Sequence, residues 1–193
     1  MDAVTAALGS VKNVNAMYLF NNATNMGSVG SDGQPLLSTQ HPIQGGKLAN
    51  TFTTAVQFSE KALEDAIAIM GATWKNYAGL PLICKPKKLL INNYLEFRAK
   101  RVIKSDYQTG TANNDINAVK HSNYFQGTTD IIVTPYLTNK YAWFILTDQP
   151  DSFKYFLRES LEVDFMTDPR TYIVVMSALE RYSFGYSTWR YVS

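Results

Sequence analysis

The chain contains very little cysteine and histidine, and this shortage narrows the chemistry that it can perform. Among its 193 residues there are one cysteine, Cys84, and two histidines, His41 and His121. A single thiol excludes an internal disulfide framework and any metal site built from several thiolates.

Long apolar runs and a strong charge of either sign are also missing. No run approaches the roughly 20 apolar residues that a helix needs to cross a bilayer. The start of the chain lacks the basic and apolar regions of a signal peptide. The net charge of +2 is too small to indicate a nucleic-acid-binding protein. An apolar content of 46% with 18% charged residues indicates instead a globular protein with a substantial core.

The histidines and the cysteine form no recognisable catalytic arrangement. His41 and His121 lie in polar segments far apart in the sequence, and neither stands beside a nucleophile motif. Cys84 precedes a basic cluster, but its position at the edge of an apolar strand favours a buried structural thiol. We therefore predict no catalytic residue, and a small hydrolase that uses His41 or His121 stays open as an alternative.

Glycines, acids and bases form no binding motif either. Gly27, Gly30 and Gly33 lack the lysine and the strand-to-helix step of a phosphate loop, which favours simple loop flexibility. The acidic residues are dispersed, so a paired-carboxylate site has no support. The basic residues within 98–104 suit a solvated helix face better than a phosphate contact. We predict no cofactor-binding residue and no metal ligand.

Helical patterns come early in the chain. Residues 2–20 are predicted to form a helix that Gly9 interrupts, and a loop rich in Asn, Gly, Ser and Pro follows over 21–50. Ser59 is expected to cap a helix that closes at residues 79–81. Apolar residues at intervals of three and four predict its buried face, which comprises Leu63, Ile67, Met70 and Trp74.

A strand and a second helix follow. The strand is predicted at 85–92, and Asn92 or Asn93 then caps a helix that continues to about residue 104. The side chains expected to be buried on this helix are Leu95, Ala99 and Val102.

Strands are predicted for the second half. After a polar, turn-prone segment at 108–123, the apolar runs Ile131–Val133 and Tyr141–Leu146 look like two strands paired with each other. Residues 151–165 continue the strand pattern. Helices followed by strands, without βαβ alternation, predict an α+β fold.

The last segment is unusually long for a strand. If 171–187 forms one strand, it spans roughly 55 Å, whereas a compact chain of this size is roughly 40 Å across. The segment must therefore bend, or the molecule must be elongated. Its end alternates Tyr182, Phe184 and Tyr186 with small residues, which predicts a ring-bearing face packed on helices and a low face open to a neighbouring chain.

Several segments, in this order, resemble the major capsid proteins of tailed phages, and the likeness is greatest to the Mu-like prophage major head subunit group. They cover roughly residues 19–190 and read "GQPLLSTQHP", "FSEKALEDAI", "LPLICKPKKLLINNYLEFRAKRVIKS", "GTANNDINAVK", "VTPYLTNKYAWFILTD", "KYFLRESLEVDF" and "ERYSFGYSTWR". The fold that this resemblance implies is that of the capsid protein of phage Hong Kong 97, a flat wedge with long helices, a long β-ribbon and a smaller axial sheet lobe.

The resemblance also implies a division of the chain. Residues 48–104 and 158–193 would form the peripheral domain, and 105–157 the axial domain. Residues 1–47 would be the remnant of a spine helix plus a long loop. Family members carry an N-terminal arm, an extended loop and most of the spine helix before the position of "LFNNATN", and the chain is expected to lack these parts.

The function implied is structural. The expected protein is a non-enzymatic head subunit that assembles through pentamers and hexamers into an icosahedral shell around DNA. Its expected partners are copies of itself, portal, scaffold or decoration proteins, and packaged DNA bound without specificity, with no membrane. Its expected location is the virion, after assembly in the cytoplasm of the bacterial host. A phage tail or connector protein is the alternative of the same class.

Overall fold

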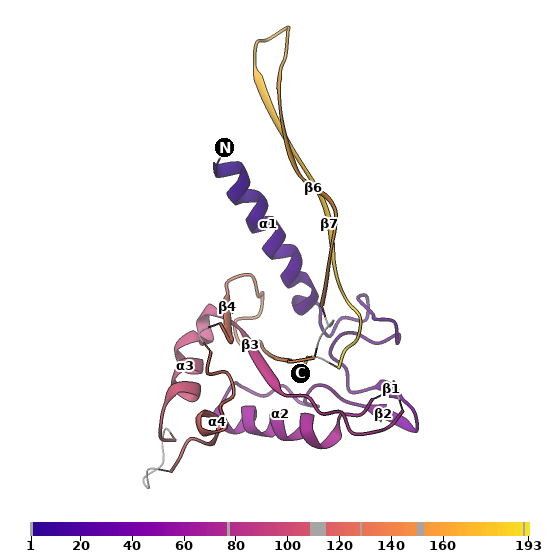
Figure 1. Cartoon of the computed structure of the whole chain (residues 1–193), viewed down its shortest axis with the longest axis vertical. Coiled ribbons are helices and arrows are strands. Elements are labelled where there is room, and N and C mark those ends of the chain that lie inside the picture. The colour runs from indigo at the N-terminus through magenta and orange to yellow at the C-terminus, as the bar shows by residue number, and fades with distance from the viewer. Residues whose placement is uncertain (1, 77, 109–114, 128, 150–152, 191) are drawn as a thin grey trace.

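The computed structural model shows an elongated molecule with a folded base and a projecting arm (Figure 1). It describes residues 2–76, 78–108, 115–127, 129–149, 153–190 and 192–193. The arm contains helix α1 (Asp2–Asn21) and the antiparallel ribbon of β6 (Phe153–Thr167) and β7 (Val174–Tyr186). The predicted helix at 2–20 is confirmed, and Gly9 does not interrupt it.

The base is built around a three-stranded sheet in the order β4-β3-β5. Strand β3 (Pro86–Asn92) lies parallel to β4 (Ile131–Thr134) and antiparallel to β5 (Trp143–Thr147). The predicted pairing of the two later strands with each other is therefore wrong. The physical reason is that the run Leu89–Ile91 is apolar on both faces and is buried best in the centre of the sheet.

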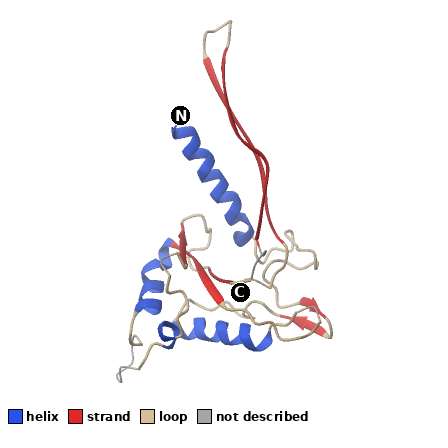
Figure 2. Ribbon diagram, in the orientation of Figure 1, coloured by secondary structure: helices blue, strands red, loops and turns tan. Residues whose placement is uncertain are grey.

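Helices α2 (Glu60–Thr73), α3 (Glu96–Lys104) and α4 (Ala118–His121) complete the base (Figure 2). The short helix η1 (Asn93–Leu95) leads into α3, and β1 (His41–Ile43) and β2 (Gly46–Leu48) form a small hairpin within the predicted loop 21–50. The mixture of helices and strands agrees with the α+β class. However, α3 and α4 lie between the parallel strands β3 and β4 in the sequence and so form a crossover connection. The predicted order of helices followed by strands did not include this crossover.

Local signals placed the helix starts correctly. The Ser59 side chain accepts a hydrogen bond from the Ala62 amide, and the Asn92 side chain accepts one from the Tyr94 amide. Helix α2 ends at Thr73 rather than at residues 79–81. Gly79 belongs instead to a separate turn, where its φ of 80° suits a residue without a Cβ.

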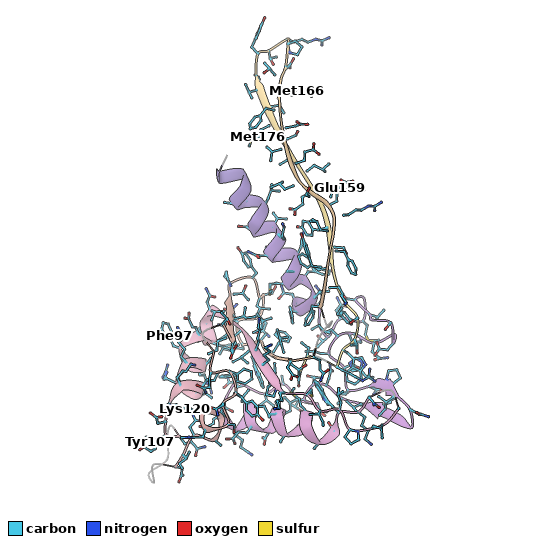
Figure 3. All side chains as sticks on the ribbon, in the orientation of Figure 1. Phe97, Tyr107, Lys120, Glu159, Met166 and Met176 are labelled. Atoms are coloured by element: carbon cyan, nitrogen blue, oxygen red, sulfur yellow. The ribbon has the colours of Figure 1, made fainter. Side chains whose placement is uncertain are left out.

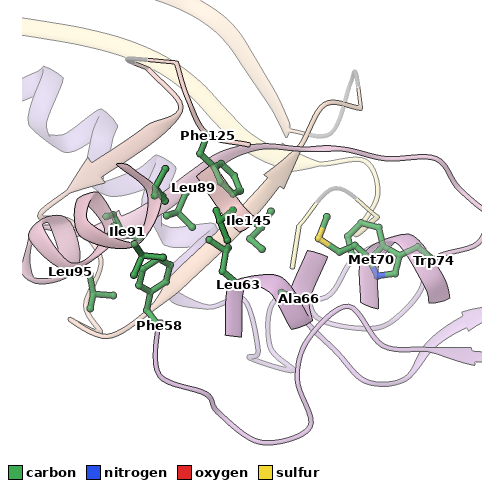
Figure 4. Packing of buried hydrophobic residues seen from close by; sticks show 14 of the residues in the cluster. Phe58, Leu63, Ala66, Met70, Trp74, Leu89, Ile91, Leu95, Phe125 and Ile145 are labelled. Atoms are coloured by element: carbon green, nitrogen blue, oxygen red, sulfur yellow. The ribbon is translucent and has the colours of Figure 1, made fainter. Parts of the chain in front are cut away.

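The main core lies between α2, the sheet and α3 (Figure 4). Leu63, Met70 and Trp74 are buried as predicted, and Ile67 packs against them partly buried. On the second helix segment, Leu95, Ala99 and Val102 are also buried as predicted.

A second cluster joins the arm to the other face of the sheet. Leu90 of β3 points into this cluster, whereas its neighbours Leu89 and Ile91 point into the main core. At the end of α1, the Phe20 ring lies 5.2 Å from the rings of both Phe144 and Phe153. The arm is thus fixed to the base by aromatic packing.

The ribbon resolves the length problem in favour of an elongated molecule. Strand β7 has 13 residues and β6 has 15, and they pair from Phe153–Tyr186 to Thr167–Val174. Irregular register between Leu157 and Glu162 adds twist without folding the ribbon back on itself. The ribbon starts at Phe153, within the segment 151–165 for which the sequence predicts a strand.

The three-stranded sheet draws its strands from two of the three ranges in the predicted division at 48–104, 105–157 and 158–193. The sheet contains β3 from the first range and both β4 and β5 from the second.

Of the polar segment 108–123, residues 109–114 lie outside the described part of the chain. Within the described part, no helix is both long enough and apolar enough to span a membrane.

Candidate assembly interface

The far end of the ribbon exposes large apolar side chains. We define the ribbon tip as residues 165–175, and Figure 3 shows how far Met166 lies from the base. Exposed fractions at the tip reach 72% for Met166 and 83% for Tyr172. The other large apolar residues exposed there are Phe165, Ile173, Val174 and Val175. Apolar surface gathered on a projection is typical of a protein–protein contact.

Helix α1 covers only the near part of the ribbon. Lys12 Nζ lies 2.6 Å from Glu180 Oε1, and Asn15 Nδ2 donates a hydrogen bond of 2.9 Å to the Tyr182 hydroxyl. The hydrogen bond to Glu180 raises the pKa of Lys12. The Glu180 side chain is 7% exposed, so this ion pair is shielded on the acidic side. These contacts leave the tip bare.

The predicted ring-bearing face of β7 is confirmed in part. Tyr182 contacts α1, and Tyr186 packs in the second cluster, close enough to Gly30 that a Cβ there would lie 2.9 Å from the Tyr186 ring. Phe184 packs instead on Tyr155 of the ribbon itself, with 5.1 Å between ring centroids. Gly30 therefore has a packing role in addition to the predicted loop flexibility.

The opposite face of the ribbon carries a large aromatic side chain from β6, whereas the pattern of β7 alone predicted only small residues there. An added Cβ on Gly185 would meet no atom within 4 Å, which agrees with a low face. However, β6 places Phe156 opposite Ser183, and the Phe156 side chain is 60% exposed. The cross-strand register, which is not visible from one strand, supplies this ring.

His41 is a structural residue at the foot of the arm. It is fully buried, its Nδ1 lies 2.7 Å from Asp32 Oδ2, and its ring stacks on Trp189 at 4.1 Å. Its Nε2 lies 3.2 Å from Asn50 Oδ1. Burial lowers the pKa of His41, and the Asp32 carboxylate opposes this effect. The alternative of a hydrolase would place a histidine in a concave pocket beside Ser or Asp. His41 does lie beside Asp32, but its side chain is fully buried.

The other two reactive candidates, His121 and Cys84, lie in different surroundings. His121 ends the short helix α4 at the surface. Burial raises the pKa of the Cys84 thiol to about 11, so the thiol stays protonated and unreactive at neutral pH. Cys84 packs partly buried against the main core, as predicted for a structural thiol. Among the described residues, no group of three or more His, Cys, Asp or Glu side chains could hold a metal ion.

Described residues of the base line a larger and a smaller hollow. The larger, of about 750 Å³, lies between the end of α1 and the segment 137–144, and its lining contains no histidine, cysteine or acidic side chain among the described residues. The smaller, of about 370 Å³, lies between the start of α2 and α3. Its lining includes Glu60, Arg98 and Arg101, and burial raises the pKa of the Glu60 carboxyl.

The basic residues of 98–104 occupy an exposed helix face, as predicted. Lys100 Nζ pairs with Glu96 Oε1 at 2.5 Å, and Lys104 Nζ donates a hydrogen bond of 2.9 Å to the Gln126 carbonyl. Arg101 Nε bonds the Phe97 carbonyl of its own helix. Within the described part of the chain, neither Arg98 nor Arg101 has an acidic partner.

An elongated molecule with exposed apolar surface on its projection has the features of a self-associating structural protein. The family comparison agrees with this class. Residues 1–192 match the family model described as phage capsid protein, and the chain belongs to that family. No curated protein matches the chain.

The family match confirms the expected function at this level. The chain is a structural subunit of a phage capsid and a component of the virion, and its family is structural rather than enzymatic. Membership also implies that copies of the chain assemble with one another.

Proposed function

We propose that the chain is a major head subunit of the Hong Kong 97 type, in the Mu-like prophage group, that assembles through pentamers and hexamers into an icosahedral shell. The observation that carries this proposal is the ribbon β6–β7, which extends beyond the base and exposes the apolar tip at 165–175. In a monomer these exposed apolar side chains contribute no hydrophobic stabilisation, whereas contact with a neighbouring subunit would remove them from water.

The proposed mechanism is geometric. Each subunit in a shell makes several contacts of modest area, and closure adds these contacts into a stable assembly. The net charge of +2 allows the inner wall to enclose DNA without binding it tightly. Portal, scaffold or decoration proteins are further proposed partners, and assembly in the host cytoplasm is proposed with them.

The division of the chain stays a prediction. In it, residues 48–104 and 158–193 are peripheral, 105–157 are axial, and 1–47 form the spine helix segment and the long loop. A comparison of subunits from pentamers and hexamers tests it, because separate domains would rotate as rigid bodies about 104–105 and 157–158. Rotation elsewhere, or none, would replace this division.

Electron microscopy of the purified full chain tests the proposed function. We expect rings with five and six members, together with curved sheets or closed shells, at micromolar concentration. Rings of one other fixed number would favour the tail or connector alternative. Particles that remain single subunits across the whole concentration range would overturn the proposal.

A further inference from the structure

The outer half of the ribbon has one face that combines acids with apolar groups. In the antiparallel register, Glu162 lies opposite Leu179, and Asp164 lies opposite Ser177. The next pair outward on this face is Met166 and Val175. All of these side chains are exposed. We define the acidic ribbon face as Glu162, Asp164, Met166, Val175, Ser177 and Leu179.

Nothing basic in the described chain neutralises this face. Arg181, the nearest cation along β7, already pairs with Glu159 at 3.2 Å. Across residues 161–179 there are three acids and a single base, Arg170. An isolated subunit therefore holds these carboxylates in water, next to apolar side chains that water solvates poorly.

The base carries a surface with arginines and exposed aromatic rings, which complements the acids and apolar groups of the acidic ribbon face. Helix α3 exposes Phe97 at 70% and η1 exposes Tyr94 at 61%, beside the guanidinium groups of Arg98 and Arg101. We define the basic α3 face as these four residues. Its two arginines line the hollow of about 370 Å³ between α2 and α3.

We propose that the acidic ribbon face of one subunit docks on the basic α3 face of a second copy. Glu162 and Asp164 then pair with Arg98 and Arg101, while Met166 and Leu179 cover Phe97 and Tyr94. Arginine suits this contact because its planar group binds carboxylates at two points and also stacks on rings. The proposal rests on the proposed function, since it names the surfaces through which the subunits associate.

The partner must be a second copy and not the same chain. In Figures 1 and 3 the ribbon leads away from the base, with Met166 near its far end and Phe97 on the base. A strand of 13 residues is about 40 Å long, and the ribbon is fixed at its foot by the second cluster. Two different surfaces in contact give a head-to-tail interface, which generates rings when the rotation closes.

Charge reversal tests the docking. We expect Glu162→Lys with Asp164→Lys, and separately Arg98→Glu with Arg101→Glu, each to weaken self-association about tenfold or more at low salt. The combination of all four substitutions, or a mixture of the two double variants, should restore it. Lys47→Glu is the matched control, because Lys47 is exposed on the β1–β2 hairpin, at the other end of the base from α3.

The outcomes separate the two proposals. If the wild-type chain associates and both double variants associate equally well, or if their combination restores nothing, the docking is wrong and the proposed function stands. If the wild-type chain remains a monomer, the proposed function itself fails.

Disulfide trapping provides a second readout that does not depend on charge. In a Cys84→Ser background, Asp164→Cys with Arg101→Cys should give covalent ladders of subunits under oxidation. The control pair, Asp164→Cys with Lys47→Cys, should not. Ladders of equal yield from both pairs, or from neither pair, would overturn the docking.

Discussion

The side chain of Asn50 ties together three segments that are distant in the sequence. Its Nδ2 donates to the Leu36 carbonyl at 2.8 Å and to the Val192 carbonyl at 3.1 Å. Its Oδ1 accepts from the Ser38 amide at 2.9 Å. Since Asn50 is 1% exposed, water cannot replace these partners.

Replacement of Asn50 by alanine should therefore destabilise the subunit strongly. We expect a loss of about 2–4 kcal/mol in the free energy of unfolding, because buried carbonyls and the His41 ring lose their partner. Chemical denaturation of the wild type and the variant measures this loss. Asn13→Ala, at an exposed position of α1, is the control. A loss below about 1 kcal/mol would contradict the anchoring role.

The buried carboxyl of Glu60 leads to a prediction about how the stability of the subunit depends on pH. Burial raises the pKa of the Glu60 carboxyl, Glu64 adds to the effect, and a hydrogen bond with Gln108 opposes it. Among the described residues, Glu60 Oε1 has no hydrogen-bond partner. The folded state therefore favours the protonated acid, and stability falls as the pH rises above the ordinary carboxyl range, through the raised pKa. Glu60→Gln should remove this fall.

Denaturation midpoints of the wild type and Glu60→Gln between about pH 4 and pH 7 measure the effect. The two proteins should differ more as the pH rises, with the variant gaining relative stability. Glu162→Gln is the control, because Glu162 is an exposed acid. A stability difference between the two proteins that does not change with pH would show that burial does not destabilise the ionised form of Glu60.

At the scale of the elements, α1 acts as a brace for the ribbon. The ion pair Lys12–Glu180 and the hydrogen bond from Asn15 to Tyr182 join them above the aromatic cluster at the foot. Lys12 is partly exposed, so water screens the pair and it contributes little to global stability. Its effect is expected on local opening instead.

The double variant Lys12→Ala with Asn15→Ala tests the brace. Amide hydrogen exchange should become faster in α1 and in residues 178–184, while exchange in β3 and α2 should stay unchanged. Lys61→Ala is the control, since its ion pair with Asp65 lies on the exposed face of α2. Unchanged exchange in α1 and β7 would mean that the aromatic cluster alone fixes the arm.

Elements governed by local patterns were predictable from the sequence. The Ser59 cap and the spacing of Leu63, Met70 and Trp74 identified α2, because capping and amphipathicity involve neighbours in the chain. The pairing of β3 with both later strands was not predictable, because strand order depends on contacts distant in sequence. His41 was read as a polar-loop residue for the same reason: its partner Trp189 comes from the far end of the chain.

The interface was predictable only in outline. The length of 171–187 indicated either a bent strand or an elongated molecule, and the alternation around Phe184 indicated a strand with unlike faces. Phe156, the acidic ribbon face and the basic α3 face required the cross-strand register and the exposure of each side chain. A single strand pattern carries neither kind of information.

For the whole molecule, the shape is the main functional feature. A compact protein of this size would bury most of its large apolar side chains, whereas this chain carries many of them on a ribbon outside the base. Such a subunit completes its burial only in contact with others. The family match and the shape therefore lead to the same conclusion.

Sedimentation velocity of the full chain over a range of concentrations tests this central claim most directly. A tip variant with Met166→Ser, Ile173→Ser and Val175→Ser provides the comparison, because these exposed residues contribute little to the fold of the monomer. We predict that the wild type sediments as oligomers and that the tip variant, with an unchanged circular dichroism spectrum, sediments mainly as a monomer. A wild type that stays monomeric throughout, or a tip variant that associates equally well, would contradict the account.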